Sequence, residues 1–293
     1  MLKRFFLAST FVVAGIALTA SAAPAAMVSN HPVSPVRTPG GRVVRGPHDS
    51  LVSSNWSGYV VAKYATGQSY TSASSTWTVP AAAVPPGQTS GYSSSWVGIG
   101  GFCENARCTR SDRTLIQLGT EQDNINGTPG YYAWYEMLPA AETPIPSSAL
   151  PVNPGDTITA SLTLLPAAGT VHSGKNGKTS TPSSWLLTMT NVTQNISWST
   201  TVTYSSSLAS AEWIEEAPWN GGILPLADYT TAIFDPGTVN GGQNPALVSS
   251  DAVIMQNSNG QTSNPSAPDA DTDGFGTCWG NGSTFTACAT PSS

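Results

Sequence analysis

The chain has 293 residues, of which 39% are hydrophobic and only 10% are charged. This length and hydrophobic content favour one large domain with a core and exclude disorder throughout the chain. Residues beyond position 50 carry 16 acidic and 6 basic side chains, and such an acidic body repels nucleic acid, so we expect no nucleic-acid partner.

The N-terminus has the features of a secretory signal. Lys3 and Arg4 precede the apolar run FFLASTFVVAGIALTA, and small residues follow it, which is the order found in signal peptides. We therefore expect residues 1–25 to be a signal peptide that is removed near Ala22 to Ala25. The run is too short for a membrane anchor, so the prediction is a secreted, extracellular monomer with no membrane partner.

Residues 26–50 form a leader that is rich in Pro, Arg and Gly and has no helix or strand period. This composition predicts a short basic propeptide or a linker. One hypothesis is that Arg37, Arg42 and Arg45 cover an acidic cleft at neutral pH and leave when the carboxylates are protonated. The alternative is a passive spacer.

From about residue 51 onward, short β-type runs bounded by Gly, Pro, Asn and Ser recur at regular intervals, and no segment has a convincing helical period. The pattern predicts one all-β domain over residues 51–293, an antiparallel β-sandwich. Residues 186–202 should form a hairpin around an Asn-containing turn. The expected strands are residues 58–64, 74–80, 93–100, 114–120, 131–138, 156–165, 185–192, 196–204, 211–216, 230–235, 251–256 and 283–289.

Four cysteines form two pairs that are close in sequence, Cys103 with Cys108 and Cys278 with Cys288. Export favours disulfides. Three connectivities are possible for four cysteines, and proximity favours two short loops. Zinc ligation is the minority alternative, because zinc sites normally show tighter CxxC spacing.

Several reaction classes lack the residues that they need. The three histidines are His31 and His48 in the leader and His172 in a Gly/Lys-rich turn, and no GxSxG motif is present, which disfavours a serine or cysteine mechanism. HExxH and His/Cys clusters with metal spacing are also missing from the sequence, so we expect no metal site. No Gly-rich loop joins a strand to a helix, and we expect no cofactor.

The segment NPSAPDADTDGFG holds Asp269, Asp271 and Asp273 before Gly274, which imitates the start of a calcium loop. The twelfth position of an EF-hand count falls on Gly280, where a Glu is required. We therefore favour a turn capped by Asp side chains.

Carboxylates inside strand-like runs are the most informative residues, because unpaired charges are rarely buried and tend to face a cleft or solvent. Glu136 and the group Glu212, Glu215 and Glu216 qualify. Side chains alternate along a strand, so Glu212 and Glu216 should share one face and Glu215 the other. A solvated strand face is the simpler explanation of these carboxylates; a catalytic cleft is the alternative.

Five motifs occur in a defined order along the chain. They are Asn55-Trp56-Ser57-Gly58, Ser95-Trp96-Val97-Gly98-Ile99, Leu115-Ile116-Gln117-Leu118-Gly119, Ala133-Trp134-Tyr135-Glu136 and Ala211-Glu212-Trp213-Ile214-Glu215-Glu216. Together they resemble the glutamic peptidases, or eqolisins, from about residue 53 to the segment GTCWGNGSTFTAC. The resemblance implies a concanavalin-like sandwich of two roughly seven-stranded antiparallel sheets, and a secreted, acid-acting endopeptidase that takes protein or peptide substrates.

The resemblance also implies site residues. The family's catalytic Gln falls on Gln117, and its catalytic Glu, the last carboxylate of its Glu-Trp/Phe-Ile-x-Glu motif, falls on Glu216. Trp56, Trp96 and Trp134, with Glu136, match residues that line or support the family's cleft and are expected to bind substrate. Gly119 shares a strand face with Gln117 and is expected to leave room beside the amide.

Three positions depart from the family pattern, and one of them is Ala217, where fungal members have an acidic residue after the catalytic Glu. Gly100 stands where fungal members have an Asp near the catalytic centre, and Glu121 stands for a second Asp after the Gln motif. The resemblance implies that Glu216 activates water while the Gln117 amide stabilises the oxyanion, without sensitivity to pepstatin. The alternative function is a carbohydrate-binding sandwich or a glycosidase, because aromatic-rich sandwiches also bind sugars and glycosidases use two glutamates in catalysis. A third hypothesis is a surface protein without catalytic activity.

Overall fold

The computed structural model describes residues 30–34, 50–166, 183–282 and 287–292. Within these ranges the only helices are the four-residue α1 (Lys63–Thr66) and the 3-10 helix η2 (Ser249–Asp251). None of the described helices is long and apolar enough to cross a membrane. The strands are β1 (Leu51–Ser53), β2 (Trp56–Ala62), β3 (Ser72–Thr78), β4 (Ser90–Gly100), β5 (Leu115–Ile125), β6 (Thr128–Met137), β7 (Thr143–Ile145), β8 (Thr157–Leu164), β9 (Ser183–Asn191), β10 (Ile196–Tyr204), β11 (Ser210–Glu216), β12 (Thr231–Val239), β13 (Ala252–Gln256), β14 (Gln261–Pro265) and β15 (Phe275–Asn281).

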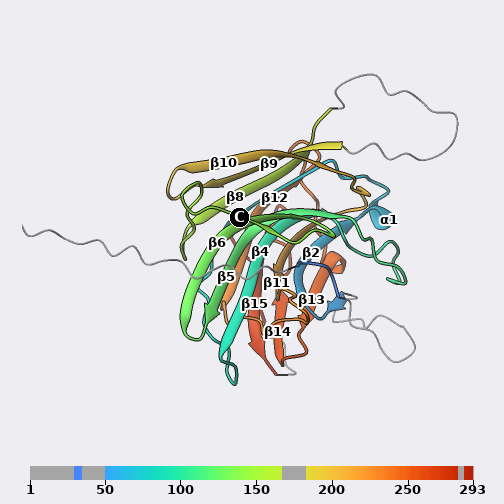
Figure 1. Cartoon of the computed structure of the whole chain (residues 1–293). Coiled ribbons are helices and arrows are strands. Elements are labelled where there is room, and N and C mark those ends of the chain that lie inside the picture. The colour runs from blue at the N-terminus through green and yellow to red at the C-terminus, as the bar shows by residue number, and fades with distance from the viewer. Residues whose placement is uncertain (1–29, 35–49, 167–182, 283–286, 293) are drawn as a thin grey trace, which may run out of the picture.

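The strands pair along one continuous path, β10-β9-β8-β3-β12-β15-β14-β13-β2-β11-β4-β5-β6-β7, and β1 joins β13 in parallel. The path folds over itself, so that β3 and β8 pack against β4 and β5 (Figure 1). Two tryptophans link the layers: Trp77 Nε1 donates to Thr120 Oγ1 (3.0 Å), and Trp213 Nε1 donates to Ser74 O (2.8 Å). The all-β sandwich is thus confirmed, with its two layers connected by strand pairing.

The main core lies between the layers and follows from strand alternation. Along β8 every second residue is buried, from Ile158 to Leu162, as expected for a strand with one face on a core. Large aromatic side chains fill the space, including the stacked rings of Phe234 and Phe275, whose centroids are 5.2 Å apart. Their burial supplies much of the hydrophobic stabilisation of the sandwich.

The predicted hairpin is present. Strands β9 and β10 pair in antiparallel register from Asn191 with Ile196 to Ser183 with Tyr204. Asn195 adopts a positive φ of 53° in the turn, a conformation that Asn tolerates better than most residues. The turn chemistry of the sequence therefore positioned this element correctly.

Not every strand was predicted. The short strands β1, β7 and β14 and the strand β15 were missed, and the last expected strand, residues 283–289, lies partly outside the described residues, with residues 287–289 irregular. Strands of three to five residues are too short to show a clear alternation. Strand β15 is interrupted by glycines, which weaken the pattern.

Both disulfides have the predicted pairing. Cys103 is bonded to Cys108 in the connection between β4 and β5, with their Cα atoms 4.8 Å apart, and Cys278 on β15 is bonded to Cys288 with their Cα atoms 5.2 Å apart. The first bridge closes an insertion that begins where β4 ends.

The acidic segment before β15 forms the predicted Asp-capped turn. The backbone N–H of Asp273 donates to Asp269 Oδ1 (3.1 Å). Asp235, from β12, also approaches, so that carboxylate oxygens of Asp235, Asp269 and Asp273 lie within 4.8 Å of one another.

A second, smaller apolar cluster covers the outer face of β2, β11, β4, β5 and β6. It contains Trp56, Trp96, Trp134 and Ile214, all buried, and Val33 of the leader packs against it. On β11, Trp213 belongs to the core between the layers while Ile214 belongs to this outer cluster. The predicted alternation along 211–216 is correct, and Glu212 and Glu216 lie on the same face as Ile214.

Candidate active site

Strand β11 lies in the middle of the outer face, between β2 and β4. Glu216 is opposite Trp56 on β2 and Ser94 on β4, whereas Glu212 is opposite Val60 and Gly98. Both carboxylates are fully buried. The expectation of solvated or cleft-exposed carboxylates is therefore wrong, and at Glu216 the leader contributes to the burial through the ring of His31.

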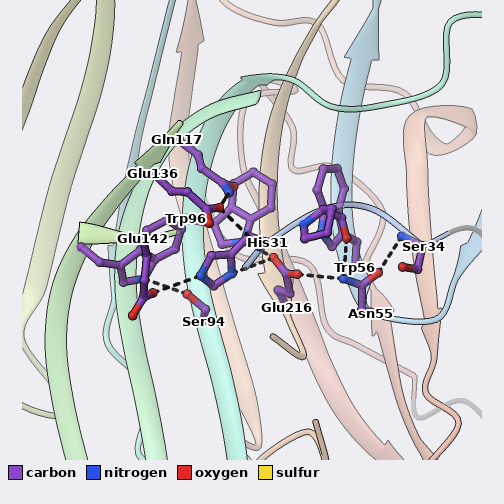
Figure 2. A network of polar contacts seen from close by, with 12 residues as sticks. His31, Ser34, Asn55, Trp56, Ser94, Trp96, Gln117, Glu136, Glu142 and Glu216 are labelled. Atoms are coloured by element: carbon purple, nitrogen blue, oxygen red, sulfur yellow. Dashed lines mark hydrogen bonds and ion pairs between the residues drawn. The ribbon is translucent and has the colours of Figure 1, made fainter. Parts of the chain in front are cut away.

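Glu216 is held by hydrogen bonds from both sides. Asn55 Nδ2 donates to Oε1 (2.8 Å), Trp96 Nε1 donates to Oε2 (2.8 Å), and His31 Nδ1 lies 3.1 Å from the same Oε2 (Figure 2). Burial raises the pKa of Glu216 above its ordinary value, and the charge of His31 and the hydrogen bonds of His31 and Trp96 lower it in part. The carboxylate is fixed in position and poised to bind a proton.

Gln117 and Glu136 form a cross-strand pair between β5 and β6. Gln117 Nε2 donates to Glu136 Oε2 at 2.6 Å, and both residues are buried. Burial raises the pKa of Glu136 to about 7, although His31 and the Gln117 amide oppose the shift. Glu136 thus fixes which end of the amide is the donor.

Gln117 and Glu216 are not direct neighbours. In register, Gln117 lies opposite Gly98, which lies opposite Glu212 on β11. Gln117 is linked to Glu216 through Glu136 and His31. The backbone N–H of His31 donates to Glu136 Oε2 (3.3 Å), and the imidazole ring of His31 contacts Glu216 (Figure 2). The structure therefore brings the two predicted catalytic residues to one polar network, with a leader residue between them.

The role expected for Gly119 is wrong. A Cβ at this position would lie 2.4 Å from Trp96 Cβ and 2.5 Å from Ser95 O, so the space beside Gly119 is filled by a tryptophan. Gly98 is the glycine next to the Gln117 side chain, because a Cβ there would lie 3.2 Å from Gln117 Cβ and 2.9 Å from a ring carbon of Trp96. The prediction named the right kind of residue on the wrong strand.

The three predicted tryptophans form one wall of the site. Trp56 and Trp96 pack edge to face with ring centroids 4.8 Å apart, and Trp134 Nε1 donates to Ser94 Oγ (3.0 Å). All three are completely buried. The face of Trp134 is covered by the His31 ring, whose centroid is 4.0 Å away at an interplanar angle of 4°.

His31 was not predicted as a site residue. Its ring lies between two carboxylates, with Nδ1 near Glu216 and Nε2 3.3 Å from Glu142 Oε2. Burial alone would lower the pKa of His31, but the charges and hydrogen bonds of Glu216, Glu142 and Glu136 raise it well above 6.5. The sequence signal was only a histidine in a Pro-rich leader, and no spacing rule connects such a residue to strands more than 100 residues away.

The leader segment 30–34 is anchored on both sides of His31. Asn30 and Trp219 exchange backbone hydrogen bonds of 3.0 Å, Asn55 Nδ2 donates to Pro32 O (2.9 Å), and the N–H of Ser34 donates to Asn55 Oδ1 (2.8 Å). Asn55 therefore binds the leader and Glu216 together. The three leader arginines lie outside the described residues, so the hypothesis that they cover the cleft stays a prediction.

A groove continues beside this segment. A cavity of about 440 Å³ is lined by the leader residues 30, 32 and 33 and, from the body, by Leu138, Pro139, Arg113 and Trp219.

A second acidic group lies beyond Glu142. Tyr132 Oη donates to Glu142 Oε1 (2.8 Å). Burial, followed by the charges of Asp123 and Glu142, raises the pKa of Glu121 well above its ordinary range, and burial raises the pKa of Asp123 to about 8. His31, Glu121 and Glu142 place ligand atoms within 4.8 Å of one another, and a histidine with two carboxylates is a donor set that could hold a metal ion.

The backbone conformation explains why residue 100 is a glycine and not the Asp of the fungal family members. Gly100 has a φ of +92°, and a Cβ there would lie 2.3 Å from Thr114 O, so no larger side chain fits. The carboxylate of Asp112 lies beside this position instead and accepts a hydrogen bond from the N–H of Gly101 (3.3 Å). An acidic group near this corner is thus supplied from a different loop.

Comparisons with known proteins agree with this geometry. The model of the Peptidase A4 family matches residues 54–273. Two similar solved structures are crystal structures of scytalido-glutamic peptidase. The one with a peptide-based transition state analog has a TM-score of 0.53 and 22% sequence identity, and the one with a transition state analog inhibitor has a TM-score of 0.50 and 21% identity. Each match covers 78% of this chain and 98% of the other chain. These structures share the fold. No curated protein sequence matches this one.

The family match covers all five motifs of the sequence and both predicted catalytic residues. It decides between the alternatives left open by the sequence, a peptidase, a sugar-binding sandwich and a surface protein, in favour of peptide hydrolysis. The chain belongs to the Peptidase A4 family, the glutamic peptidases.

Proposed function

We propose that the chain is a secreted, acid-acting endopeptidase in which Glu216 is the general base and Gln117 donates a hydrogen bond to the oxyanion. The observation that carries the proposal is the extended leader segment 30–34, which lies across the Glu216 carboxylate with its backbone held by Asn55 and Trp219. A cleft that holds one peptide segment beside a fixed carboxylate has the shape needed for a peptide substrate.

The chemistry requires the position now filled by the His31 ring. With that ring displaced, ionised Glu216 would take a proton from a bound water, which attacks the substrate carbonyl. The carbonyl oxygen becomes negative and accepts a hydrogen bond from Gln117 Nε2. Glu216 then transfers the proton to the leaving amine, and the peptide bond breaks.

The environment of Glu216 predicts the pH dependence. Burial raises the pKa of Glu216 above its ordinary value and the charge of His31 opposes this shift; departure of the leader removes the His31 charge together with the leader's own share of the burial. A base must be ionised, so activity should fall as the pH drops through this raised pKa. We expect the acid limb of kcat/KM to have a midpoint above 4.5 and the optimum to be weakly acidic.

The test is cleavage of a denatured protein by the purified full chain from pH 2 to 8, with and without pepstatin. Glu216→Gln and Gln117→Ala should each lower kcat by about 100-fold or more, since an oxyanion donor alone is worth roughly 100- to 1000-fold. Pepstatin should have no effect.

Glu215→Gln is the matched control. Glu215 is equally buried but points to the opposite face of β11, where Ser95 Oγ donates to it. Its variant should keep the wild-type rate, and retained cleavage by Glu216→Gln would refute the assignment of the base. N-terminal sequencing of the exported protein tests the signal peptide.

A further inference from the structure

Three aspartates converge between strand β12 and the connection that leads from β14 to β15. Asp235 belongs to β12, and Asp269 and Asp273 belong to the connection. One carboxylate oxygen of each lies within 4.8 Å of those of the other two. Calcium binds carboxylate oxygens at about 2.4 Å, so two oxygens on opposite sides of one ion are about 4.8 Å apart. The three carboxylates are therefore close enough to share a single ion.

Asp269 is the residue whose contacts point to a ligand. It is only 5% exposed, and its Oδ1 accepts a hydrogen bond from the backbone N–H of Asp273 (3.1 Å). Its Oδ2 is buried and accepts no hydrogen bond from any described residue, and the same is true of Asp273 Oδ1. Buried carboxylate oxygens without a donor are unfavourable, and a bound cation supplies the partner that they need.

Gly274 shows where the unpartnered oxygen points. A Cβ on this residue would collide with Asp269 Oδ2 and would lie 2.8 Å from Asp235 Cγ. Asp269 Oδ2 therefore faces the Asp235 carboxyl group beside Gly274, and only glycine lets the two approach so closely. The pairing of β12 with β3 is irregular between Phe234 and Gly237, and a bulge of this kind redirects the side chain within it.

The described residues supply no positive charge to this cluster. None of the ion pairs between described residues includes Asp235, Asp269 or Asp273, and no Lys or Arg follows Lys178 in the sequence. Carboxylates this close repel one another unless protons or a cation neutralise them. A single cation does so for all three at once, whereas a proton bridges only two oxygens.

The donor set favours calcium among the common metal ions. Zinc prefers nitrogen and sulfur ligands, whereas calcium takes about six to eight oxygens in a flexible arrangement. Magnesium requires a nearly ideal octahedron, which side chains from a strand and a separate connection do not readily form. Asp235 and Asp273 are partly exposed, so water molecules can complete the coordination.

We propose that the carboxylates of Asp235, Asp269 and Asp273 form a calcium site that fastens β12 to the β14–β15 connection. The sequence-based preference for a capped turn, without a metal, rested on a linear EF-hand count. Such a count cannot include Asp235, which comes from another strand, and it gives weight to Asp271, which is exposed. The site involves neither Glu216 nor Gln117 and does not depend on the proposed function.

The ion would stabilise the support of strand β11. The N–H of Gly237 donates to Asp273 O (2.8 Å), and the N–H of Leu247 donates to Thr272 O (2.9 Å). Gly237 also lies against Trp213 of β11, since a Cβ on it would be 2.9 Å from the indole Nε1. Calcium at this place should therefore raise the thermal stability of the chain without taking part in cleavage.

The first experiment measures the melting temperature of the full chain at pH 7.5 after dialysis against EDTA. Calcium at 10 mM should raise it by at least about 3 °C, as expected for a ligand well above a Kd on the order of 0.1–1 mM, and excess EDTA should reverse the shift. Sodium chloride of the same ionic strength controls for screening and should have little effect. Equal shifts with the two salts, or no shift with calcium, would overturn the proposal.

Three variants locate the effect. Asp269→Asn keeps an oxygen for the N–H of Asp273 but removes the charge, and it should lose the calcium shift. Asp235→Asn should lose it too, and this partly exposed position provides the test if Asp269→Asn does not fold. Asp271→Asn is the matched control, because it removes one exposed charge from the same connection, and it should keep the wild-type shift. If all three variants behaved alike, the effect would come from the acidic charge in general and the site would be refuted.

Terbium(III) luminescence measures binding directly, because this ion takes the same oxygen ligands as calcium and is excited through nearby tryptophans. The full chain should give a signal that calcium displaces. Asp269→Asn should bind calcium at least ~10-fold more weakly than the wild type, and Asp271→Asn should match the wild type. A signal and a calcium affinity that persist unchanged in Asp269→Asn and Asp235→Asn would place the ion elsewhere and refute this assignment. Neither readout uses cleavage, so the proposed function stands or fails separately.

Discussion

At the scale of single residues, the site depends on which atom of each polar group is a donor. Gln117 can stabilise an oxyanion only with its Nε2, and the amide keeps that orientation because Glu136 Oε2 accepts from it at 2.6 Å. Gln117 Oε1 accepts no hydrogen bond from any described residue. A rotation of the amide by 180° would present this acceptor to the oxyanion and repel it.

Glu136 is therefore expected to act as a positioning residue. Glu136→Ala should lower kcat by about 10- to 100-fold with little change in KM, because the amide loses its orienting partner. Glu136→Gln should restore much of the rate, since a glutamine oxygen accepts the same bond and the native side chain, with a pKa of about 7, is itself neutral in acid.

Steady-state kinetics of both variants at pH 4 to 5 check this prediction. A structural role alone would change the melting temperature of both without separating their kcat values. Equal kcat for Glu136→Ala and wild type would show that Gln117 does not need this partner.

At the scale of elements, the outer face works because glycines leave space for large side chains on neighbouring strands. Gly119 on β5 lies between Trp96 on β4 and Trp134 on β6 in register. Both tryptophans project to the same face, so a side chain on Gly119 would displace Trp96, whose indole donates to Glu216. Packing on one strand thus controls a hydrogen bond on another.

Gly119→Ala is expected to lower the free energy of unfolding by about 1–3 kcal/mol, the usual cost of overpacking, and to reduce kcat through the displaced indole. Gly222→Ala is the control, because a Cβ there meets nothing within 4 Å. Urea unfolding measures the free energy of unfolding of both variants. A Gly119→Ala protein as stable as Gly222→Ala would mean that Trp96 can move without cost.

At the scale of the whole molecule, many carboxylates are buried in an acidic body. Burial raises the pKa of Glu215 to about 8, of Asp123 to about 8 and of Glu212 well above its ordinary value. The folded state therefore holds protons that the unfolded chain releases at lower pH. Stability should fall as pH rises from about 4.5 towards 8, since the unfolded state binds fewer protons in that range.

We expect the melting temperature to be highest at about pH 3.5–4.5 and to decline steadily to pH 8. Glu215→Gln replaces a buried acid by a neutral group of the same shape and should reduce this decline, by an amount on the order of a few kcal/mol at pH 8. Calorimetry across the pH range checks both curves. A melting temperature that rises towards pH 8 would contradict the assignment of neutral buried carboxyls.

The sequence by itself determined the all-β class, most strands, both disulfides, the two faces of β11 and the family to which the motifs belong. These features depend on local alternation, on turn residues and on short motifs, which can be recognised without long-range contacts. The short strands β1, β7 and β14 and the glycine-interrupted β15 lacked such a local signal.

Only the tertiary structure decided how the site is assembled. It showed that Gly98 rather than Gly119 lies beside the Gln117 side chain, that Glu136 accepts a hydrogen bond from the Gln117 amide, and that the His31 ring lies against Glu216. Each of these contacts joins segments far apart in the chain, and His31 and Glu216 are separated by 185 positions. Strand pairing and register set such contacts, and a residue's local pattern carries no information about which distant strand or leader segment will face it.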